Sequence, residues 1–381
     1  MNPITLLQPP HLVFGNGCAP RCAPFLAERG VRRVLLVTCT PLVGELAPIL
    51  DALRQARLQA VVAPPVDREP TGKLLEDVLA AARAETVQGV LGIGGGSAMD
   101  VAKLAAALAN GRQRAEDVFG INRLPRRELL LVCLPTTAGT GAEVSPNAVL
   151  LDENEGLKKG VVSPHLVPDG AFVDPLLTVS APPAVTAATG LDALTHCIEA
   201  YANRFAHPLV DTFALEGIRL ISAHLLAAVR NGRDLEARAA LALGSLYGGL
   251  CLGPVNTAAV HALAYPLGGK FHVAHGVANA LLLPHVLRFN RPAAAGRYAA
   301  ISAALGVPRN GSENGTAESG IEWLAQLSRD CGVPQTLSQL KIPRDALPAL
   351  AGSAMQVTRL LKNNPRPVTD ADALQIYEAA Y

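Results

Sequence analysis

The chain has 381 residues, of which 50% are hydrophobic and 17% are charged, so it is long enough for two domains and is not composed like a disordered protein. Its 33 basic and 32 acidic residues leave a net charge of +1, and aromatic residues make up only 4%. This composition indicates neither a basic surface for a phosphate backbone nor platforms for stacked bases, and we expect no nucleic-acid partner.

The sequence gives no sign of a secretory or membrane segment. Residues 1–10 lack a basic start followed by an apolar core. Long apolar stretches are interrupted by Gly, Pro or a charge before they reach membrane-spanning length. The seven cysteines are scattered, which is not typical of a disulfide framework. We therefore expect a cytoplasmic protein with no membrane partner.

The first half of the chain alternates between short β-rich and helical segments. Residues 31–38 have a charged start and then a continuous apolar run, which is typical of a strand buried on both faces. Repeated strand–helix alternation predicts an α/β domain with a parallel sheet and helices on both faces. The expected strands are 31–38, 59–63, 89–93 and 129–135, and the expected helices are 42–57, 73–85 and 97–110.

After about Val179 the pattern changes to Ala/Leu-rich helices that continue almost to the C-terminus. Pro182 and Pro183 stand at this change, and no convincing strand follows it. We predict two domains, an α/β domain at 1–179 and an all-helical domain at 180–381, with the active site in the cleft between them.

A candidate metal site lies in the helical half. Asp192 and His196 are four residues apart in a segment of good helical character, which places both side chains on one face of a helix. Gly190 just before them would let the chain enter that helix tightly. His261 and His275 lie in a segment that we expect to be a helix broken at residues 266–269, where the chain could fold back.

Sequence spacing alone leaves open that these histidines are separate core or surface groups. If the four side chains do converge, one carboxylate and three imidazoles suit Fe²⁺ or Zn²⁺ better than Ca²⁺ or Mg²⁺. The absence of thiolates argues against a purely structural zinc site. A single carboxylate also leaves a net charge of about +1, which can polarise a carbonyl or stabilise an alkoxide.

Two further segments suit a bound dinucleotide. Gly94–Ser97 follows an expected strand and opens a helix, where glycines and free N–H groups allow a phosphate to approach. It lacks the G-x-G-x-x-G pattern, and a tight turn would explain it as well. Residues 135–145 (PTTAGTGAEVS) offer hydroxyls and amides for pyrophosphate and ribose, although an ordinary polar loop has the same composition.

Together, FGNG at 14–17, GGGSAMDVAK, PTTAGTGAEVS, TGLDALTHCIEAY, HALAYPLG…HG and Ala278-Asn279 resemble the iron-containing (group III) alcohol dehydrogenase family over about residues 12–290. The resemblance implies NAD- or NADP-linked interconversion of an alcohol and a carbonyl compound, with Fe²⁺ as metal, although Zn²⁺ satisfies the same ligands. It also implies a homodimer, which is common in similar proteins. The implied metal ligands are Asp192, His196, His261 and His275, and the implied cofactor contacts are Gly95, Gly96, Ser97, Asp100, Thr136, Thr137, Thr140, Ser145, Asn147 and Lys158.

The chain departs from the family pattern at two places. Many members have an Asp after the first expected strand that repels the 2′-phosphate of NADP, and here Cys39 stands there, so NADP is not excluded. A His of many relatives is replaced by Tyr265. We consider Tyr265 and His272 as catalytic candidates for proton transfer, and either residue could instead only pack the pocket wall.

The expected substrate is a small, largely uncharged alcohol or aldehyde, because no basic cluster stands near the metal segments. Related folds also include 3-dehydroquinate synthases, glycerol dehydrogenases and maleylacetate reductases. A maleylacetate reductase-like enzyme is the main alternative, since it differs mainly in pocket residues. A non-catalytic dinucleotide-binding protein is the other alternative.

Overall fold

The structure is a computed structural model that describes residues 3–153 and 155–381. Backbone contacts divide the chain into an α/β unit, residues 6–137 and 141–180, and a helical unit, which consists of residues 181–381 and the short segments up to Thr5 and at 138–140. Sequence analysis assigned both short segments to the first domain.

A six-stranded sheet forms the centre of the α/β unit, and each pair of neighbouring strands is parallel. The predicted fold class, a parallel α/β domain followed by an all-helical one, is confirmed. Two strands of four residues each, at one side of the sheet, were missed. In spatial order the strands are β1 (His11–Phe14), β9 (Gly170–Val173), β6 (Leu130–Pro135), β4 (Gly89–Gly94), β2 (Arg33–Val37) and β3 (Gln59–Val62).

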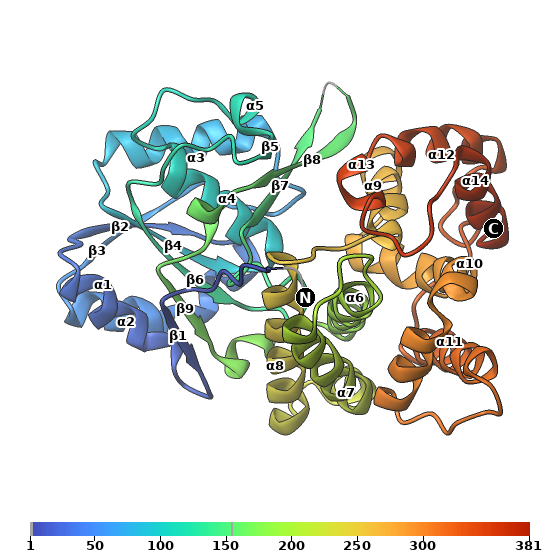
Figure 1. The fold of residues 1–381 in the computed structure, drawn as a ribbon. Helices are drawn as coiled ribbons and strands as arrows, with labels where there is room; N and C mark the ends of the chain where they lie inside the picture. Colours follow the sequence, from blue (N-terminus) through green and yellow to red (C-terminus); the bar gives the residue numbers. More distant parts are fainter. Residues whose placement is uncertain (1–2, 154) are drawn as a thin grey trace. The chain divides into compact units, whose positions relative to one another are not determined.

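Helices cover both faces of this sheet (Figure 1). Alternate residues of β2 point to opposite faces: Leu35 packs in one hydrophobic cluster and Leu36 in the other. The first cluster includes α3 (Gly72–Ala84) and α4 (Gly96–Leu108), and the second includes α1 (Cys22–Glu28) and α2 (Ala47–Gln55). Burial on both faces explains why the central strands are continuously apolar.

The helix predicted at 42–57 is shorter than expected. Residues Thr40–Glu45 form a 3-10 helix, and the α-helix begins only at Ala47. The amphipathic pattern did not show where the 3-10 helix ends and the α-helix begins. Pro41 and Pro48 each fit the first turn of a helix, so either could mark the start.

A small second sheet has one strand before the 135–145 segment and two strands after it. It contains β5 (Gly120–Ile121), β8 (Leu157–Val162) and β7 (Asn147–Asp152), and β7 and β8 pair antiparallel. Sequence analysis did not predict it, because β8 begins with the polar sequence Leu-Lys-Lys rather than with an apolar run.

The described residues after Val173 contain helices and turns but no strand. Their helices pack around one large hydrophobic cluster, in which α6, α7 and α8 are mutual neighbours. One of them, α7, is long and apolar enough to span a membrane, and one of its sides packs in this cluster. The helices are α6 (Pro183–Tyr201), α7 (Pro208–Arg230), α8 (Leu235–Leu252), α9 (Ala259–Phe271), α10 (His275–Ala304), α11 (Glu313–Asp330), α12 (Leu347–Met355), α13 (Thr358–Leu361) and α14 (Asp370–Ala379), and α5 (Ala115–Val118) belongs to the α/β unit.

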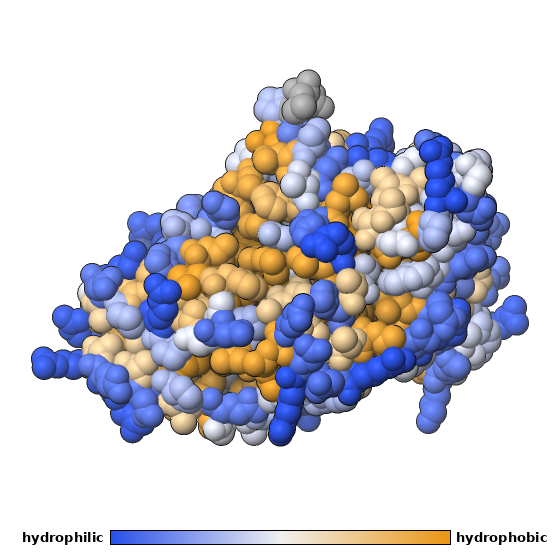
Figure 2. All heavy atoms as spheres, turned by 90° about the horizontal axis from the view of Figure 1, so that it is seen from below, coloured by the Kyte–Doolittle hydropathy of each residue, from blue (hydrophilic) through white to orange (hydrophobic). Residues whose placement is uncertain are grey.

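Both edges of the large sheet expose hydrophobic side chains. Leu12 and Phe14 on β1 are 38% and 39% exposed, and Val62 on β3 is 63% exposed. Hydrophobic residues also lie between hydrophilic ones on the face drawn in Figure 2.

Candidate active site

Helix α6 carries the first two candidate metal ligands. Asp192 and His196 are buried on one face of it, with Asp192 Oδ1 3.9 Å from His196 Nε2. The role predicted for Gly190 is wrong, because α6 already begins at Pro183. A Cβ atom at Gly190 would lie 2.3 Å from Leu225 Cδ1, so the glycine instead allows α6 to pack closely against α7.

The other two histidines come from α9 and α10. His261 lies in α9, and His275 is the first residue of α10. The predicted break at 266–269 is wrong, since α9 continues through Pro266 to Phe271 and ends at His272, whose φ is 54°. Residues 259–268 are all buried, and this packing keeps the segment helical although Pro266 lacks a backbone N–H.

The start of α10 lies directly on α6. A Cβ atom at Gly276 would be 2.1 Å from the backbone oxygen of Ala188, so only glycine fits between the two helices. This close approach brings His275 to Asp192, with Nε2 3.7 Å from Oδ1.

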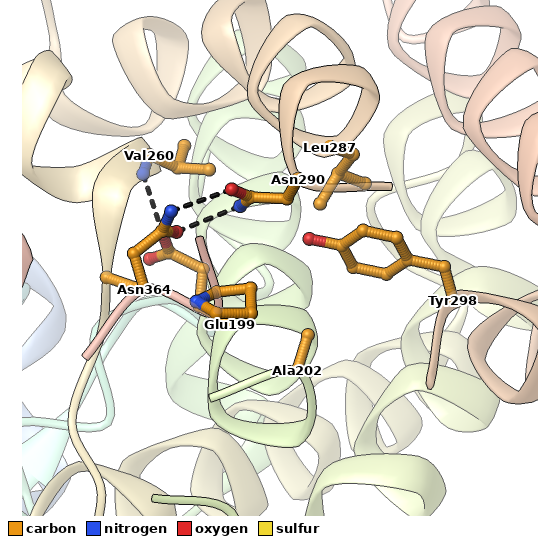
Figure 3. Close-up of a pocket in the computed structure, with 9 residues that line it drawn as sticks. Glu199, Ala202, Val260, Leu287, Asn290, Tyr298 and Asn364 are labelled. Carbon is orange, nitrogen blue, oxygen red and sulfur yellow. Dashed lines mark hydrogen bonds between the residues drawn. The ribbon is translucent and has the colours of Figure 1, made fainter. Parts of the chain in front are cut away.

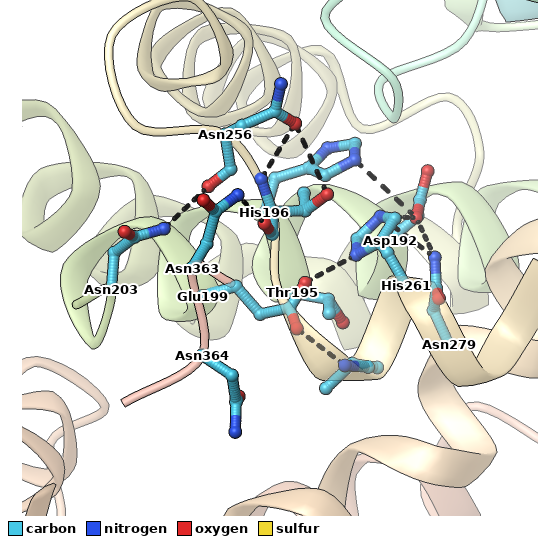
Figure 4. Close-up of polar contacts among 12 residues, drawn as sticks. Asp192, Thr195, His196, Glu199, Asn203, Asn256, His261, Asn279, Asn363 and Asn364 are labelled. Carbon is cyan, nitrogen blue, oxygen red and sulfur yellow. Dashed lines mark hydrogen bonds and ion pairs between the residues drawn. The ribbon is translucent and has the colours of Figure 1, made fainter. Parts of the chain in front are cut away.

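The three side chains Asp192, His261 and His275 converge, and Figure 4 shows the first two of them beside Asn279. His261 Nε2 lies 3.5 Å from Asp192 Oδ1, and one donor atom from each of the three residues lies within 4.8 Å of the others. Donors bound tetrahedrally at about 2.1 Å from one ion lie roughly 3.4 Å apart. The separations therefore fit a shared cation.

His196 is adjacent to this group but is not among the three. Its ring stacks on that of His261 with centroids 4.7 Å apart and an angle of 18° between the planes. Burial lowers the pKa of His196, which favours the neutral imidazole that a metal requires.

Asn279, one turn after His275 on α10, also belongs to the site, and sequence analysis assigned it no role. Its Nδ2 lies 2.6 Å from Asp192 Oδ1, 3.1 Å from His261 Nε2 and 3.3 Å from His275 Nε2. The amide thus faces all three convergent donor atoms. The four-residue spacing from His275 is the signal that could have identified it.

A second carboxylate, that of Glu199, contacts His261 from the other side. Glu199 Oε2 is 2.6 Å from His261 Nδ1, and both side chains are buried. Burial alone would lower the pKa of His261, but Glu199 and Asp192 outweigh it and raise that pKa to about 10. For Asp192, burial is outweighed by the three histidines, which hold its pKa well below the ordinary range.

The buried side-chain polar atoms without a hydrogen-bond partner test whether the site suits a bound metal and dinucleotide. Among the described residues there are four: His196 Nδ1, which lies near the Gly139 backbone without ordinary hydrogen-bond geometry, Asn279 Oδ1, Thr38 Oγ1 and Asn147 Oδ1. His196 and Asn279 lie beside the convergent histidines. Asn147 is a predicted dinucleotide contact, and Thr38 is next to Cys39 in the sequence. Since buried polar groups are normally paired, these positions fit sites that a ligand completes.

The glycine segment lies where the sequence placed it, after β4 and at the start of α4. Gly95 is the residue before the helix, and Gly96 and Ser97 form its first turn. A Cβ atom at Gly94 would be 2.7 Å from the Cβ of Ala98, so the glycines let α4 pack closely on β4. Thr136 follows β6, and its N–H donates to the Gly94 oxygen at 3.0 Å.

Buried charges support this edge of the sheet. Lys103 is fully buried, and Nζ donates to the backbone oxygens of Ser145 and Asn147 at 2.9 and 2.8 Å. Asp100 accepts from the Val149 N–H at 2.9 Å, and burial raises its pKa to about 6. Lys103 thus holds the segment after residue 144 against α4.

The remaining predicted cofactor contacts have different surroundings. Thr137 is the side chain nearest to Gly95, with Oγ1 3.4 Å from the position of an added Cβ. Thr140 falls in the short segment that groups with the helical unit. Lys158 is nearly buried and pairs with Glu69, with Nζ 2.7 Å from Oε1.

The two catalytic candidates differ in burial. Tyr265, one turn after His261, is 6% exposed, its ring centroid lies 6.0 Å from that of His275, and its hydroxyl accepts from Arg359 at 3.0 Å. His272 is exposed at the end of α9, and no hydrogen bond from its ring to another described residue is present. Of the two candidates, only Tyr265 has a described ring contact with one of the convergent histidines.

The chain is similar to known proteins over its whole length. Residues 9–175 match the family model for iron-containing alcohol dehydrogenase, and residues 186–381 match that for the C-terminal part of the Fe-containing alcohol dehydrogenase family. A long-chain-alcohol dehydrogenase 1 from Geobacillus thermodenitrificans is 41% identical, over 100% of this chain and 98% of its own. An NAD-dependent methanol dehydrogenase from Bacillus methanolicus is 32% identical over 98% of both chains.

A solved structure of a 1,3-propanediol oxidoreductase superposes with a TM-score of 0.96 at 34% identity, over 100% of both chains. The resemblance noted in the sequence is confirmed: the chain belongs to the iron-containing alcohol dehydrogenase family.

Proposed function

We propose that the protein is a metal-dependent, NAD(P)-linked alcohol dehydrogenase that also reduces the corresponding aldehyde or ketone. The observation that carries this proposal is the convergence of Asp192, His261 and His275 in a chain of this family. The family relatives named as alcohol dehydrogenases support the reaction class.

We propose Asp192, His196, His261 and His275 as the metal ligands. A divalent ion held there supplies Lewis-acid polarisation of the substrate oxygen. The burial of these side chains, of which three are at most 4% exposed, excludes water from their side of the site. Family membership favours Fe²⁺ as the metal, and the same ligand set accepts Zn²⁺.

The dinucleotide is proposed to bind along the carboxyl ends of β4 and β6, with nicotinamide accepting or donating the hydride. Gly95, Gly96 and Ser97 offer N–H groups at the start of α4 to a pyrophosphate. Thr136, Thr137 and Ser145 offer hydroxyls nearby, and Asn147 offers its unpaired Oδ1. Asp100, Thr140 and Lys158 complete the proposed set.

For the choice of coenzyme, we propose a preference for NAD over NADP. Although Cys39 is neutral, Asp67 lies against the next residue: its Oδ1 accepts from Thr40 N and its Oδ2 from Thr40 Oγ1, both at 2.7 Å. These hydrogen bonds lower the pKa of Asp67 and keep it charged. Asp67 follows β3 in the sequence, but this contact puts its carboxylate beside the residues after β2. A carboxylate at the ribose end of a dinucleotide site favours a free 2′-hydroxyl over a 2′-phosphate.

We propose Tyr265 rather than His272 as the side chain that moves a proton near the substrate. Arg359 donates to the Tyr265 hydroxyl, so that hydroxyl is free to donate its own proton in another direction. The homodimer, the cytoplasmic location, the absence of nucleic-acid and membrane partners, and the position of the active site between the domains stay predictions.

The test of this function is a substrate panel assayed with NAD and NADP before and after treatment with a chelator. We expect alcohol-dependent NADH formation that is lost on chelation and returns with Fe²⁺ or Zn²⁺. Full activity after complete metal removal contradicts the proposal. Turnover of maleylacetate with none of simple alcohols or aldehydes supports the alternative reductase instead.

A further inference from the structure

We infer that Glu199 is a positioning residue of the metal centre, which fixes the orientation of the His261 ring. This inference rests on the proposed function, because it takes His261 as a metal ligand. Glu199 is 5% exposed and lies on α6, two turns after Asp192, so the same helix supplies both carboxylates.

Both oxygens of Glu199 are used by consecutive residues at the start of α9. Oε1 accepts from the backbone N–H of Val260 at 2.7 Å (Figure 3). Oε2 lies 2.6 Å from His261 Nδ1 (Figure 4). Since α9 begins at Ala259 and the residue before it makes no side-chain cap, the N–H of Val260 has no partner inside the helix. Glu199 therefore caps α9 from another helix and fixes the height and rotation of His261.

The contact also determines which ring nitrogen carries hydrogen. A hydrogen bond from His261 to the Glu199 carboxylate requires a hydrogen on Nδ1, which leaves Nε2 to face the proposed metal position. On that side of the ring, Nε2 lies 3.1 Å from Nδ2 of Asn279 and 3.5 Å from Asp192 Oδ1. Glu199 thus holds the ring by the nitrogen that points away from the other proposed ligands.

The other side of Glu199 faces a small cavity of about 10 Å³, which is room for one water molecule (Figure 3). No basic residue lines this cavity. Its polar walls include Asn290 and Asn364, whose amides bind each other in both directions at 2.8 and 2.7 Å, and Tyr298.

The contact bears on how firmly this site would hold a metal. A carboxylate hydrogen-bonded behind a ligand histidine makes that histidine a stronger donor. We therefore expect Glu199 to raise the metal affinity of the site.

Glu199→Gln separates this role from simple packing. The amide has one accepting oxygen, but Val260 N–H and His261 Nδ1–H both need an acceptor. The variant must either leave the Val260 N–H unpaired or force His261 into the tautomer that protonates Nε2. Loss of such a partner lowers metal affinity by about 10–100-fold. Glu199→Asp retains two accepting oxygens and should recover part of this loss.

The experiment measures the affinity of the apoprotein for Zn²⁺ by competition with a chromogenic chelator, and the visible spectrum after loading with Co²⁺. Tyr377→Phe is the matched control, since it removes a buried hydrogen bond of 2.6 Å to the Leu263 oxygen of the same α9. We expect E199Q to bind Zn²⁺ at least tenfold more weakly with an altered Co²⁺ spectrum, E199D to lie between, and Y377F to match the wild type.

Equal affinity and spectra for E199Q and wild type overturn the inference, and so does an equal loss in Y377F. If the wild-type chain binds no metal, the proposed metal centre fails first and this inference fails with it. If the wild type binds one ion and E199Q binds it with the same affinity and spectrum, the metal centre stands and only the proposed role of Glu199 is wrong.

Discussion

The side-chain amide of Asn279 donates a hydrogen bond to Asp192 Oδ1 at 2.6 Å. The bond joins α10 to α6 and restrains the only carboxylate among the proposed metal ligands. Replacing Asn279 with Ala removes this restraint, and we expect metal affinity to fall by roughly tenfold. The measurement is equilibrium competition with a chelator, with Asn310→Ala, an exposed asparagine of the same unit, as control. Wild-type affinity in N279A is the contrary result.

The Tyr265 hydroxyl makes a kinetic prediction. Tyr265→Phe keeps the ring beside His275 but removes the group that accepts from Arg359. We expect kcat to fall by about tenfold or more with little change in KM, because loss of a positioned proton donor mainly affects the chemical step. His272→Ala, at an exposed position, should retain wild-type kcat. Steady-state kinetics decide this, and the reverse pattern would show that His272 is the proton donor.

Coenzyme choice provides a third prediction, centred on Asp67 and Cys39. Asp67→Asn removes the charge held by Thr40, so the ratio of kcat/KM for NADP to that for NAD should rise by about tenfold. Cys39→Asp adds a carboxylate next to the same position and should lower the ratio. Initial rates with both coenzymes measure these changes. If D67N leaves this ratio unchanged, Asp67 is not the source of the coenzyme preference.

Glu143 gives a prediction for stability against pH. Burial raises its pKa from 4.5 to about 7 in the folded chain. Between these values the unfolded chain releases this proton while the folded chain retains it. Glu143 therefore makes stability fall as pH rises through that interval, by up to about 3 kcal/mol at 1.36 kcal/mol per pKa unit.

Glu143→Gln cannot titrate, so its stability relative to the wild type should be higher at pH 8 than at pH 5. Thermal unfolding midpoints of the two apoproteins at both pH values measure this difference. If the gap between the proteins is the same at pH 5 and pH 8, Glu143 does not titrate in this way.

The parts of the fold that could be predicted are those encoded locally. The continuous apolar runs of β2, β4 and β6 identify buried parallel strands, and the four-residue spacing of Asp192 and His196 places both on one helix face. The strands β1 and β9 were not predicted, and their pairing joins distant parts of the chain, which leaves no local signal.

The features that could not be predicted depend on tertiary packing. Burial of α9 holds it helical beyond Pro266, against the local preference of proline. Glu199 and His261 are 62 residues apart, and Asn279 and Asp192 are 87 apart, so neither contact has a local signal. The convergence of His261 and His275 on Asp192 could be expected only from the family resemblance.

The most direct test of the central claim is the metal content of purified chains, measured by elemental analysis after equilibration with Fe²⁺ or Zn²⁺. The account predicts about one ion per wild-type chain, and close to none in Asp192→Asn, because the carboxylate that the three histidines surround is then lost. A D192N chain that folds and still holds one ion per chain with wild-type affinity would contradict it.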